Sequence, residues 1–507
     1  MNKFIKKAIS VVCAAVATTT LFACGGGKET KCPYTLPDYS AAERELKLFG
    51  YYTPGSGKYV LDGVPYYTQN NITVEKYTEY KEAGFNIASV NGNDALGKNE
   101  SFEGSDAQKM FKTAKEAGID RVILIDSYFT SYLMHADNYG GDNSVFKSEQ
   151  EFQTAVEQRV SQYKNEPNFY GLMLFDEPSW KNMDNYGKIY RALRKALPDA
   201  FFHCNFHPAT ASSAEVCDLE GYKKEHGRYP TDEEAYEEYF RVFFTKTGAN
   251  RVSVDAYPFL SQSFKQNYYS GLQIMKKVCD EFGAELAFTV QSLAFYRKGT
   301  LENRAVSKSD MWLQMNSVLG FGADTVAYYT YMPFGIEEGS TRYLTDGSFL
   351  RKDGTPTNIY YYGKEIMTAV NKFSNVLMNY KYKGAKIYLG EVIGNGSAVQ
   401  YTDGSRKFDN SYEFELLKGL TQDNDAVLAT ELFDEKNGLY MYMLLNAIDP
   451  GYDSRNGNTA MTITADFTGY EWVAEFDCGE LNYVKLTDGK YTKTLSAGYA
   501  TYLIPLK

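Results

Sequence analysis

Two acidic side chains, Asp176 and Glu177, follow the apolar run YGLMLF (170–175) and precede Pro178. Adjacent carboxyl groups push each other's pKa values apart, so one can keep its proton near neutral pH while the other is ionised. Such a pair can donate a proton to a leaving group and orient a second group beside it. The same residues also suit a helix start, because Asp is a common N-cap and Glu and Pro are common in a first turn. The elements around the pair must decide between these two interpretations.

Eight strand-like apolar runs alternate with helical segments along the first two thirds of the chain, as expected for parallel strands buried on both faces. The runs are 46–51, 86–90, 121–126, 170–175, 200–205, 251–255, 285–290 and 325–329. Thr73 and Asp106 are candidate N-caps of two of the intervening helices, which end at Gly84 and Gly118. Eight β–α units predict an α/β fold, a (β/α)8 TIM barrel. The alternative is a doubly wound open sheet, which usually carries a Gly-rich phosphate turn after its first strand; this chain has none there.

The chain changes character after residue 382. Short alternating segments follow, broken by Gly, Asn and Asp turns, and no helical pattern remains. This pattern predicts a C-terminal antiparallel β-sandwich domain. We therefore expect the barrel to span residues 46–382 and the sandwich to span residues 383–507.

The N-terminus has a basic start and a short Ala- and Thr-rich apolar stretch that ends in LFAC, with Cys24 as its last residue. That ending resembles a bacterial lipobox, which implies a signal peptide over residues 1–23 and a lipidated Cys24. Residues 24–45 are then the lipidated cysteine and a tether that begins with three glycines. The alternative is an ordinary cleaved signal peptide. The prediction is an extracytoplasmic protein anchored by lipid to the bacterial cell membrane.

Composition excludes several classes of partner. The formal net charge is −11 and no basic stripe appears, so a nucleic-acid partner is not expected. The seven cysteines show no metal-ligand spacing, and no metal or cofactor is predicted; Cys204 and Cys217 leave a disulfide open. Phosphate loops and nucleophile elbows are absent. The 44 tyrosines suit sugar binding, because rings stack on C–H faces while phenols bond hydroxyls, although they suit a large surface equally well.

Functional residues of a barrel gather at the C-terminal ends of its strands, so these ends predict one site. The expected catalytic residues are Glu177, Asp176 and Asp255. The expected substrate-binding residues are Tyr51, Asn91, Asp126, Trp180, Asn205, His207, Tyr257, Gln291, Tyr329 and Tyr331. Some of these have structural alternatives: Asp255 could brace its loop, Trp180 could pack on the next helix, and a lone His is more often structural.

An acidic pair at the fourth strand, eight β–α units and a C-terminal sandwich together resemble the (β/α)8 glycoside hydrolases. In the large retaining superfamily of that group, strand 4 ends in Asn-Glu with Glu as acid/base, and a Glu ending strand 7 is the nucleophile. This chain has Asp176 in place of the Asn and Gln291 in place of the nucleophile. Glu302 lies eleven residues further on and is expected to be too far along the loop.

The Asp-Glu-Pro motif itself resembles that of acetamido-sugar hydrolases, including β-N-acetylgalactosaminidases. This resemblance implies that Glu177 is the general acid/base, that Asp176 orients the substrate's own N-acetyl group, and that Tyr257 or Tyr329 bonds the acetamide oxygen. A third mechanism is inversion, with Asp255 or Asp126 activating water. The predicted function is a surface-anchored hydrolase of oligo- or polysaccharides. The alternative, suggested by Gln291, is a non-catalytic carbohydrate-binding lipoprotein with a degenerate barrel site.

Overall fold

The computed structural model describes most of the chain. The described residues are 31–58, 60–61, 64–65, 69–265, 267–297, 299–338, 341–346, 348–389, 406–452 and 459–507. The predicted signal peptide and Cys24 lie outside these residues. Within the described part, no helix is both long and apolar enough to cross a membrane.

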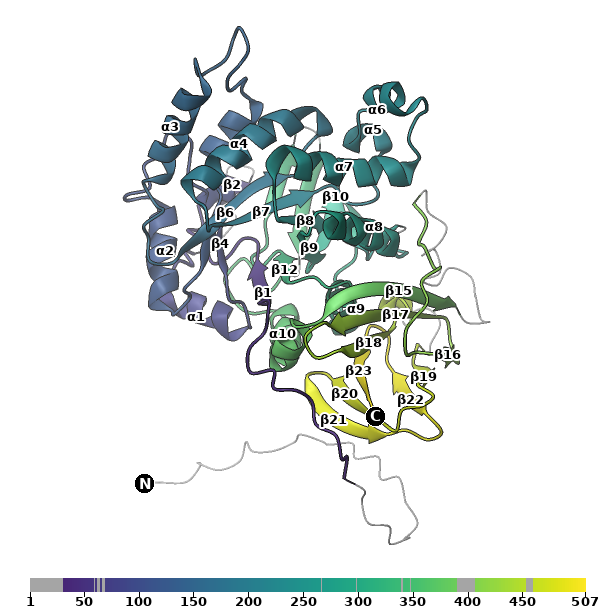
Figure 1. Cartoon of the computed structure of the whole chain (residues 1–507). Helices are drawn as coiled ribbons and strands as arrows, with labels where there is room; N and C mark the ends of the chain where they lie inside the picture. The colour runs from purple at the N-terminus through teal and green to yellow at the C-terminus, as the bar shows by residue number, and fades with distance from the viewer. Residues whose placement is uncertain are drawn as a thin grey trace, which may run out of the picture.

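An eight-stranded, all-parallel sheet forms the first part of the structure, in the order β1-β12-β9-β8-β7-β6-β5-β4 (Figure 1). Its strands are β1 (Lys47–Gly50), β4 (Ala88–Val90), β5 (Val122–Leu124), β6 (Phe169–Asp176), β7 (Phe201–Phe206), β8 (Arg251–Asp255), β9 (Glu285–Gln291) and β12 (Thr325–Tyr329). Every strand coincides with a predicted apolar run, so the predicted barrel is confirmed.

The side chain of Asn86 joins β1 to β4, the two strands at the ends of that order. Its Oδ1 atom accepts a hydrogen bond from the Leu48 amide (2.8 Å), and its Nδ2 atom donates to the Leu46 carbonyl (2.8 Å). The backbone N–H of Ile87 donates to the Leu48 carbonyl at 3.2 Å. The Asn86 side chain therefore supplies one donor and one acceptor to the backbone of residues 46 and 48, where regular backbone pairing between β1 and β4 is missing.

Helices lie around the outside of these strands (Figure 1). They are α1 (Val74–Glu82), α2 (Asp106–Glu116), α3 (Glu149–Val160), α4 (Met183–Ala196), α7 (Asp232–Thr247), α8 (Tyr268–Glu281), α9 (Lys308–Gly320) and α10 (Asn358–Leu377), with α5 (Ser213–Val216) and α6 (Leu219–His226) inserted between β7 and α7. Thr73 caps α1 as predicted. Ser105 caps α2 in place of Asp106, because the Ser105 hydroxyl accepts the Gln108 N–H at 3.1 Å.

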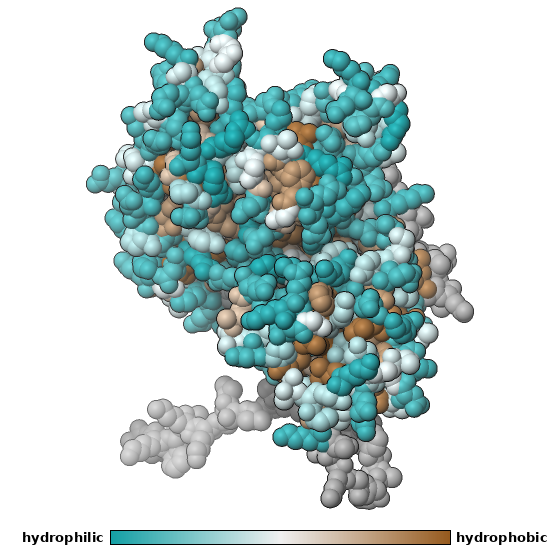
Figure 2. Space-filling model, in the orientation of Figure 1, coloured by the Kyte–Doolittle hydropathy of each residue, from teal (hydrophilic) through white to brown (hydrophobic). Residues whose placement is uncertain are grey.

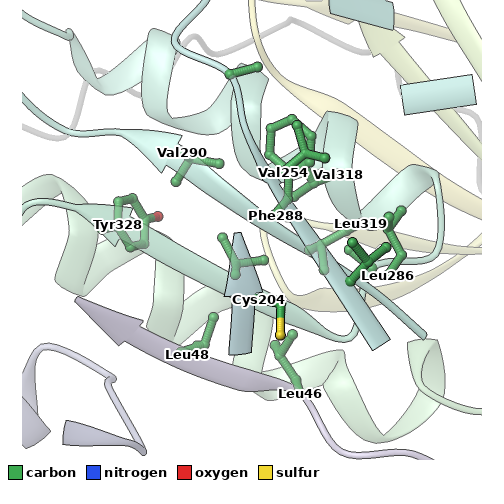
Figure 3. Close-up of a cluster of buried hydrophobic side chains, with 14 of the residues drawn as sticks. Leu46, Leu48, Cys204, Val254, Leu286, Phe288, Val290, Val318, Leu319 and Tyr328 are labelled. Atoms are coloured by element: carbon green, nitrogen blue, oxygen red, sulfur yellow. The ribbon is translucent and has the colours of Figure 1, made fainter. Parts of the chain in front are cut away.

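Outward-facing apolar side chains of the strands pack against the helices. Figure 3 shows Val254 of β8 and Phe288 of β9 beside Val318 of α9, and Leu286 of β9 beside Leu319 of α9. These residues are almost fully buried. Burial on both faces explains why the strands appear in the sequence as nearly continuous apolar runs.

The remaining strands of the barrel part belong to its loops. A four-stranded antiparallel sheet has the order β11-β10-β14-β13, and β2 pairs with β3. Their bounds are β2 (Val60–Leu61), β3 (Val64–Pro65), β10 (Ala294–Arg297), β11 (Thr300–Asn303), β13 (Gly335–Glu338) and β14 (Thr341–Asp346). Short 3-10 or π turns are η1 (Gly92–Asp94), η2 (Tyr128–Tyr132), η3 (Leu133–His135), η4 (Trp180–Asn182) and η6 (Pro450–Tyr452).

Two antiparallel sheets make up the C-terminal part, which confirms the predicted β-sandwich. In sheet order, the larger contains β15 (Lys381–Leu389), β17 (Ala426–Asp434), β18 (Leu439–Asn446), β23 (Ala500–Leu506), β20 (Trp472–Asp477) and β21 (Glu480–Lys485), and the smaller contains β16 (Gly419–Gln422), β19 (Met461–Asp466) and β22 (Lys490–Leu495). Val427, Leu444 and Ile463 belong to the core between them. The face of Figure 2 is mostly hydrophilic, with small apolar groups, some over these sheets.

The sandwich packs on α9 and α10 of the barrel part (Figure 1). The Tyr502 hydroxyl donates to Asn316 Oδ1 of α9 (3.3 Å), and the Phe373 ring of α10 lies 5.1 Å from the Tyr502 ring. Residues near the N-terminus join the same region: the Tyr39 hydroxyl donates to Asp434 Oδ2 at 2.8 Å. The described end of the predicted tether is therefore packed against folded protein.

Candidate active site

A cavity of about 350 Å³ opens at the C-terminal ends of the barrel strands. Asp176 ends β6, Asp255 ends β8, Tyr329 ends β12, and Tyr51 directly follows β1. The residues that line the cavity are Tyr51, Asp176, Glu177, Asn205, Asp255, Tyr257, Lys265, Phe295, Arg297, Glu302, Asn303, Tyr329 and Phe334. All three predicted catalytic residues are therefore brought together, along with four of the predicted binding residues.

Asp176 is held by an amide that is itself held by two hydroxyls. The Asn205 side chain donates from Nδ2 to Asp176 Oδ1 at 3.1 Å. Its Oδ1 atom accepts from the hydroxyls of Ser253 and Thr289, each at 3.3 Å. These contacts fix which way the amide points. Burial raises the pKa of Asp176, and the nearby Glu177 charge acts in the same direction.

Glu177 projects into the cavity from a strained backbone. Its φ angle is +43°, in the left-handed region that residues other than glycine rarely adopt. The Glu177 N–H still donates to the Asn205 carbonyl (2.9 Å), so the neighbouring strand holds this conformation in place. The side chain is 45% exposed. Strain of this kind is typical of functional sites, where it aims a side chain.

His207 lies beside Glu177 although it does not line the cavity. Its Nδ1 atom is 3.5 Å from Glu177 Oε1. Burial lowers the pKa of His207, but the hydrogen bond and the charge of Glu177 outweigh burial, and the net shift is upward. The carboxylate of Glu177 therefore stabilises the protonated form of His207.

Asp255 holds its proton more tightly than an ordinary carboxyl group. Burial, then the charges of Glu177 and Asp176, raise the pKa of Asp255 to about 8. Its Oδ1 atom is buried and has no hydrogen-bond partner among the described residues. A carboxyl group with this pKa is mostly protonated at neutral pH, which is the wrong state for a base that activates water.

We expect Asp255→Asn to raise the melting temperature clearly near pH 9 and little near pH 4. The folded-state pKa of Asp255 lies above its ordinary value of 3.8. The wild type therefore loses stability as the pH rises from about 4 to about 8, and the neutral amide does not. Scanning calorimetry of both proteins at the two pH values measures the difference. Equal changes in melting temperature at both would contradict the raised pKa.

Aromatic rings form one wall of the cavity. The Tyr329 ring stacks near Tyr257 (centroids 5.6 Å apart, planes at 21°) and near Phe295 (6.0 Å, 15°). Tyr51 meets Tyr329 edge-on at 5.4 Å, and its hydroxyl lies 2.9 Å from Nε2 of the buried His203. The peptide bond after Tyr329 is cis. Such a wall offers flat apolar faces for a ring-shaped ligand and phenol groups for its polar substituents.

Asp126, predicted as a binding residue or water-activating base, does not line the cavity. It is buried, with Oδ2 2.7 Å from Arg159 Nε and Oδ1 2.8 Å from Arg159 Nη2. The Tyr163 hydroxyl donates to the same carboxylate at 3.1 Å. Its hydrogen-bonding capacity is used inside the protein, so this role for Asp126 is corrected to a structural one.

Gln291 and Trp180 also lie away from the cavity. The buried Gln291 amide donates to the Leu293 carbonyl (3.0 Å) and the Arg304 carbonyl (2.8 Å), so it holds loops together. The Trp180 indole donates to the Ala214 carbonyl (3.0 Å) and lines a separate pocket between α4, α6 and α7. Neither is placed to touch a ligand in the cavity.

Asn91 and Tyr331 likewise serve the fold. Asn91 is nearly buried, and its Oδ1 atom accepts the Tyr52 N–H at 2.9 Å. Tyr331 is fully buried, and its ring packs against those of Tyr80 (4.8 Å) and Phe349. Both follow a strand end, as predicted, but their side chains point into packed protein.

The residues that sequence reasoning missed come from loops that fold back over the barrel. They are Lys265, Phe295, Arg297, Glu302, Asn303 and Phe334. Glu302 was expected to lie too far along its loop, but β10 and β11 form a hairpin that returns it to the cavity. There it pairs with Arg297 (3.3 Å). The Lys298-Gly299 turn signal between alternating residues was the sequence feature that could have indicated this hairpin.

No protein-family model and no curated protein sequence matches this chain. Among solved structures, it is similar to a glycoside hydrolase family 5 protein from Bacteroides vulgatus, with 11% identity and a TM-score of 0.50 over 92% of this chain and 89% of that one. A family 39 glycoside hydrolase from Bacteroides cellulosilyticus gives 11% identity and a TM-score of 0.47, over 91% of this chain and 81% of that one. The first likeness agrees with the fold described above: a (β/α)8 barrel with C-terminal antiparallel sheets.

Proposed function

We propose that this protein is a glycoside hydrolase that cleaves glycosidic bonds of an oligo- or polysaccharide, with Glu177 as the general acid/base. The observation that carries the proposal is the convergence of Asp176, Glu177 and Asp255 on one cavity with an aromatic wall, at the C-terminal end of a (β/α)8 barrel. A carboxyl group at the cavity mouth can protonate a glycosidic oxygen, and the rings can stack on the sugar.

The favoured mechanism is substrate-assisted. Asp176, oriented by Asn205, accepts the N–H of an acetamido group and aims its carbonyl oxygen at the anomeric carbon. Glu177 gives its proton to the leaving oxygen as that C–O bond breaks and the acetamide oxygen bonds to the anomeric carbon. A water molecule then attacks this carbon, Glu177 takes its proton, and the acetamide is released. Tyr257 or Tyr329 bonds the acetamide oxygen.

The other two mechanisms have less support. Inversion needs an ionised Asp255, but burial and the charges of Glu177 and Asp176 raise the pKa of that carboxyl group to about 8. A retaining mechanism needs a nucleophilic carboxylate from the enzyme. The position expected for it, the end of β9, holds Gln291, whose amide is buried and hydrogen-bonded to the Arg304 carbonyl. Glu302 is a carboxylate in the cavity, but it is paired with Arg297.

The test is sugar release from a panel of aryl glycosides that includes N-acetylhexosaminides, with and without the Glu177→Gln change. A thiazoline analogue of the cyclised acetamide intermediate should inhibit the wild type competitively. Hydrolysis of acetamido sugars that is insensitive to the thiazoline would remove the substrate-assisted route while leaving the hydrolase proposal in place.

The second candidate is a carbohydrate-binding protein without catalysis. Gln291 favours it, because an amide cannot serve as nucleophile. The two candidates separate in one experiment: sugars bound by the purified wild type but never cleaved, across a broad glycan panel, would select the binding protein.

We further propose that the protein is displayed outside the cytoplasm on a lipid anchor at Cys24. The lipobox-like LFAC sequence and the following glycines support this. Expression in a bacterial host with radiolabelled palmitate should label the wild type and leave Cys24→Ala unlabelled and released from membranes. A Cys24→Ala protein that stays membrane-bound would contradict the anchor.

A further inference from the structure

Lys265 lines the cavity although it stands ten residues after Asp255 at the end of β8. The loop between them turns back on itself, because the Lys265 N–H donates to the Pro258 carbonyl at 2.7 Å and Phe259 pairs with Phe264. The loop thus returns the lysine to the mouth of the barrel near Asp255.

The same loop is joined to the β10–β11 hairpin. The Ser261 N–H donates to the Glu302 carbonyl (2.9 Å), and the Asn303 side chain donates to the Tyr257 carbonyl (3.1 Å). Leu260 also pairs with Asn303 as an isolated bridge. Backbone contacts and one side-chain hydrogen bond therefore fasten the two loops to each other, which gives the Lys265 backbone a defined place at the cavity.

The Lys265 ammonium makes no hydrogen bond or ion pair within 4.0 Å in the part of the chain that the structure describes. Burial lowers the pKa of Lys265, while the charges of Asp255, Glu177 and Glu302 act in the opposite direction. Asp255 lines the same cavity, and its Oδ1 atom also lacks a partner among the described residues. The cavity thus holds a buried acceptor without a protein partner and a half-buried donor that makes no protein hydrogen bond, and one ligand group can bond to both.

We propose that Lys265 and Asp255 together bind a ring hydroxyl of the sugar and so determine which sugar the cavity accepts. A hydroxyl is donor and acceptor at once: it donates its hydrogen to Asp255 Oδ1 while its oxygen accepts from the Lys265 ammonium. This inference deepens the proposed function, since it rests on the cavity binding a sugar.

The charges around Lys265 favour a neutral hydroxyl over an anionic substituent. Glu177, Asp255 and Glu302 all act on its ammonium, and Asp176 lines the same cavity. A carboxylate or sulfate placed beside Lys265 would be repelled by those of these groups that are ionised. A hydroxyl adds no charge and satisfies both open groups.

The test measures sugar binding by calorimetry in the Glu177→Gln variant, which is expected to bind the sugar without hydrolysing it. The ligands are glucose, galactose, their N-acetylamino forms and glucuronic acid, followed by the monodeoxy analogues of the tightest binder. Removing the bonded hydroxyl should weaken binding about 10-fold or more, as expected for a hydrogen bond to a charged group. Lys265→Met should weaken binding of the parent sugar by a similar factor. In this variant the parent sugar and that one deoxy analogue should bind with equal affinity. Lys112→Met, an exposed lysine of α2, is the matched control and should change nothing.

Three outcomes would overturn the inference: no sugar binds, Lys265→Met weakens all analogues equally, or glucuronic acid binds tightest through Lys265. The variant's melting curve checks its fold, and Lys265→Gln, which keeps a donor, should retain part of the affinity. If the protein hydrolyses no glycan but Lys265→Met still abolishes the effect of removing that one hydroxyl, only the hydrolase proposal is contradicted. If the protein hydrolyses glycans but Lys265→Met does not abolish the effect of removing that hydroxyl, only the inference about Lys265 and Asp255 is contradicted.

Discussion

Glu177→Gln is expected to lower kcat by about 10²- to 10⁴-fold while sugar affinity changes little, because general acid–base catalysis contributes rate factors of that size. Glutamine has nearly the shape of glutamic acid but no proton to give to the glycosidic oxygen. The strained backbone at this position is held by the hydrogen bond from its N–H to Asn205, which the substitution keeps. Initial rates of sugar release and calorimetric binding measure the two quantities separately.

The leaving group provides the sharper control. Aryl glycosides with an acidic phenol need little help from a proton donor, so the loss in kcat should shrink on them. Glu116→Gln, an exposed glutamate of α2, should behave as wild type. Unchanged kcat in Glu177→Gln on an alkyl glycoside would exclude Glu177 as the acid. Asp255, which keeps a proton near neutral pH, would then be the next residue to test.

Asp324→Asn is expected to lower the free energy of unfolding by about 3–5 kcal/mol, the range measured when one partner of a buried ion pair is removed. Asp324 is fully buried at the N-terminal ends of the strands, where its carboxylate meets Lys47 Nζ (2.9 Å) and the Arg251 guanidinium. The Thr325 hydroxyl donates to it at 2.8 Å. Without its charge, two buried cations lack their shared partner. Urea unfolding followed by circular dichroism measures the change.

The effect should depend on pH in a defined direction. Burial raises the pKa of Asp324, but Arg251 and Lys47 outweigh burial, and the net pKa is lowered. The stabilisation is therefore present above the ordinary Asp pKa of about 4 and is lost as the pH falls below it. Asp184→Asn is the matched control, because Asp184 is 79% exposed and its ion-pair partner Lys246 is 45% exposed. It should change stability by less than about 1 kcal/mol. Equal losses in the two variants would contradict a central role for Asp324.

Much of the barrel was predictable because its strands are buried on both sides. Burial on both faces leaves a nearly continuous apolar run, as in β6 and β12, and eight such runs separated by helix caps have few folds to choose from. The same logic placed Asp176, Asp255 and Tyr329 at one rim, since all strands of a parallel barrel end on the same side. The adjacent acids at the fourth strand were visible in the sequence for that reason.

The amino-acid pattern alone therefore indicates the fold and the end of the barrel at which the cavity lies. Which strand-end residues reach that cavity depends on contacts that form only in the folded protein. Asp126 and Asp255 both end apolar runs, yet Arg159 of α3 binds the Asp126 carboxylate, whereas Oδ1 of Asp255 has no partner among the described residues. Lys265 and Glu302 enter only because two loops are fastened together by backbone hydrogen bonds. Strand periodicity is local and can be read along the chain, whereas these pairings join segments distant in sequence, and their geometry exists only after the chain has folded.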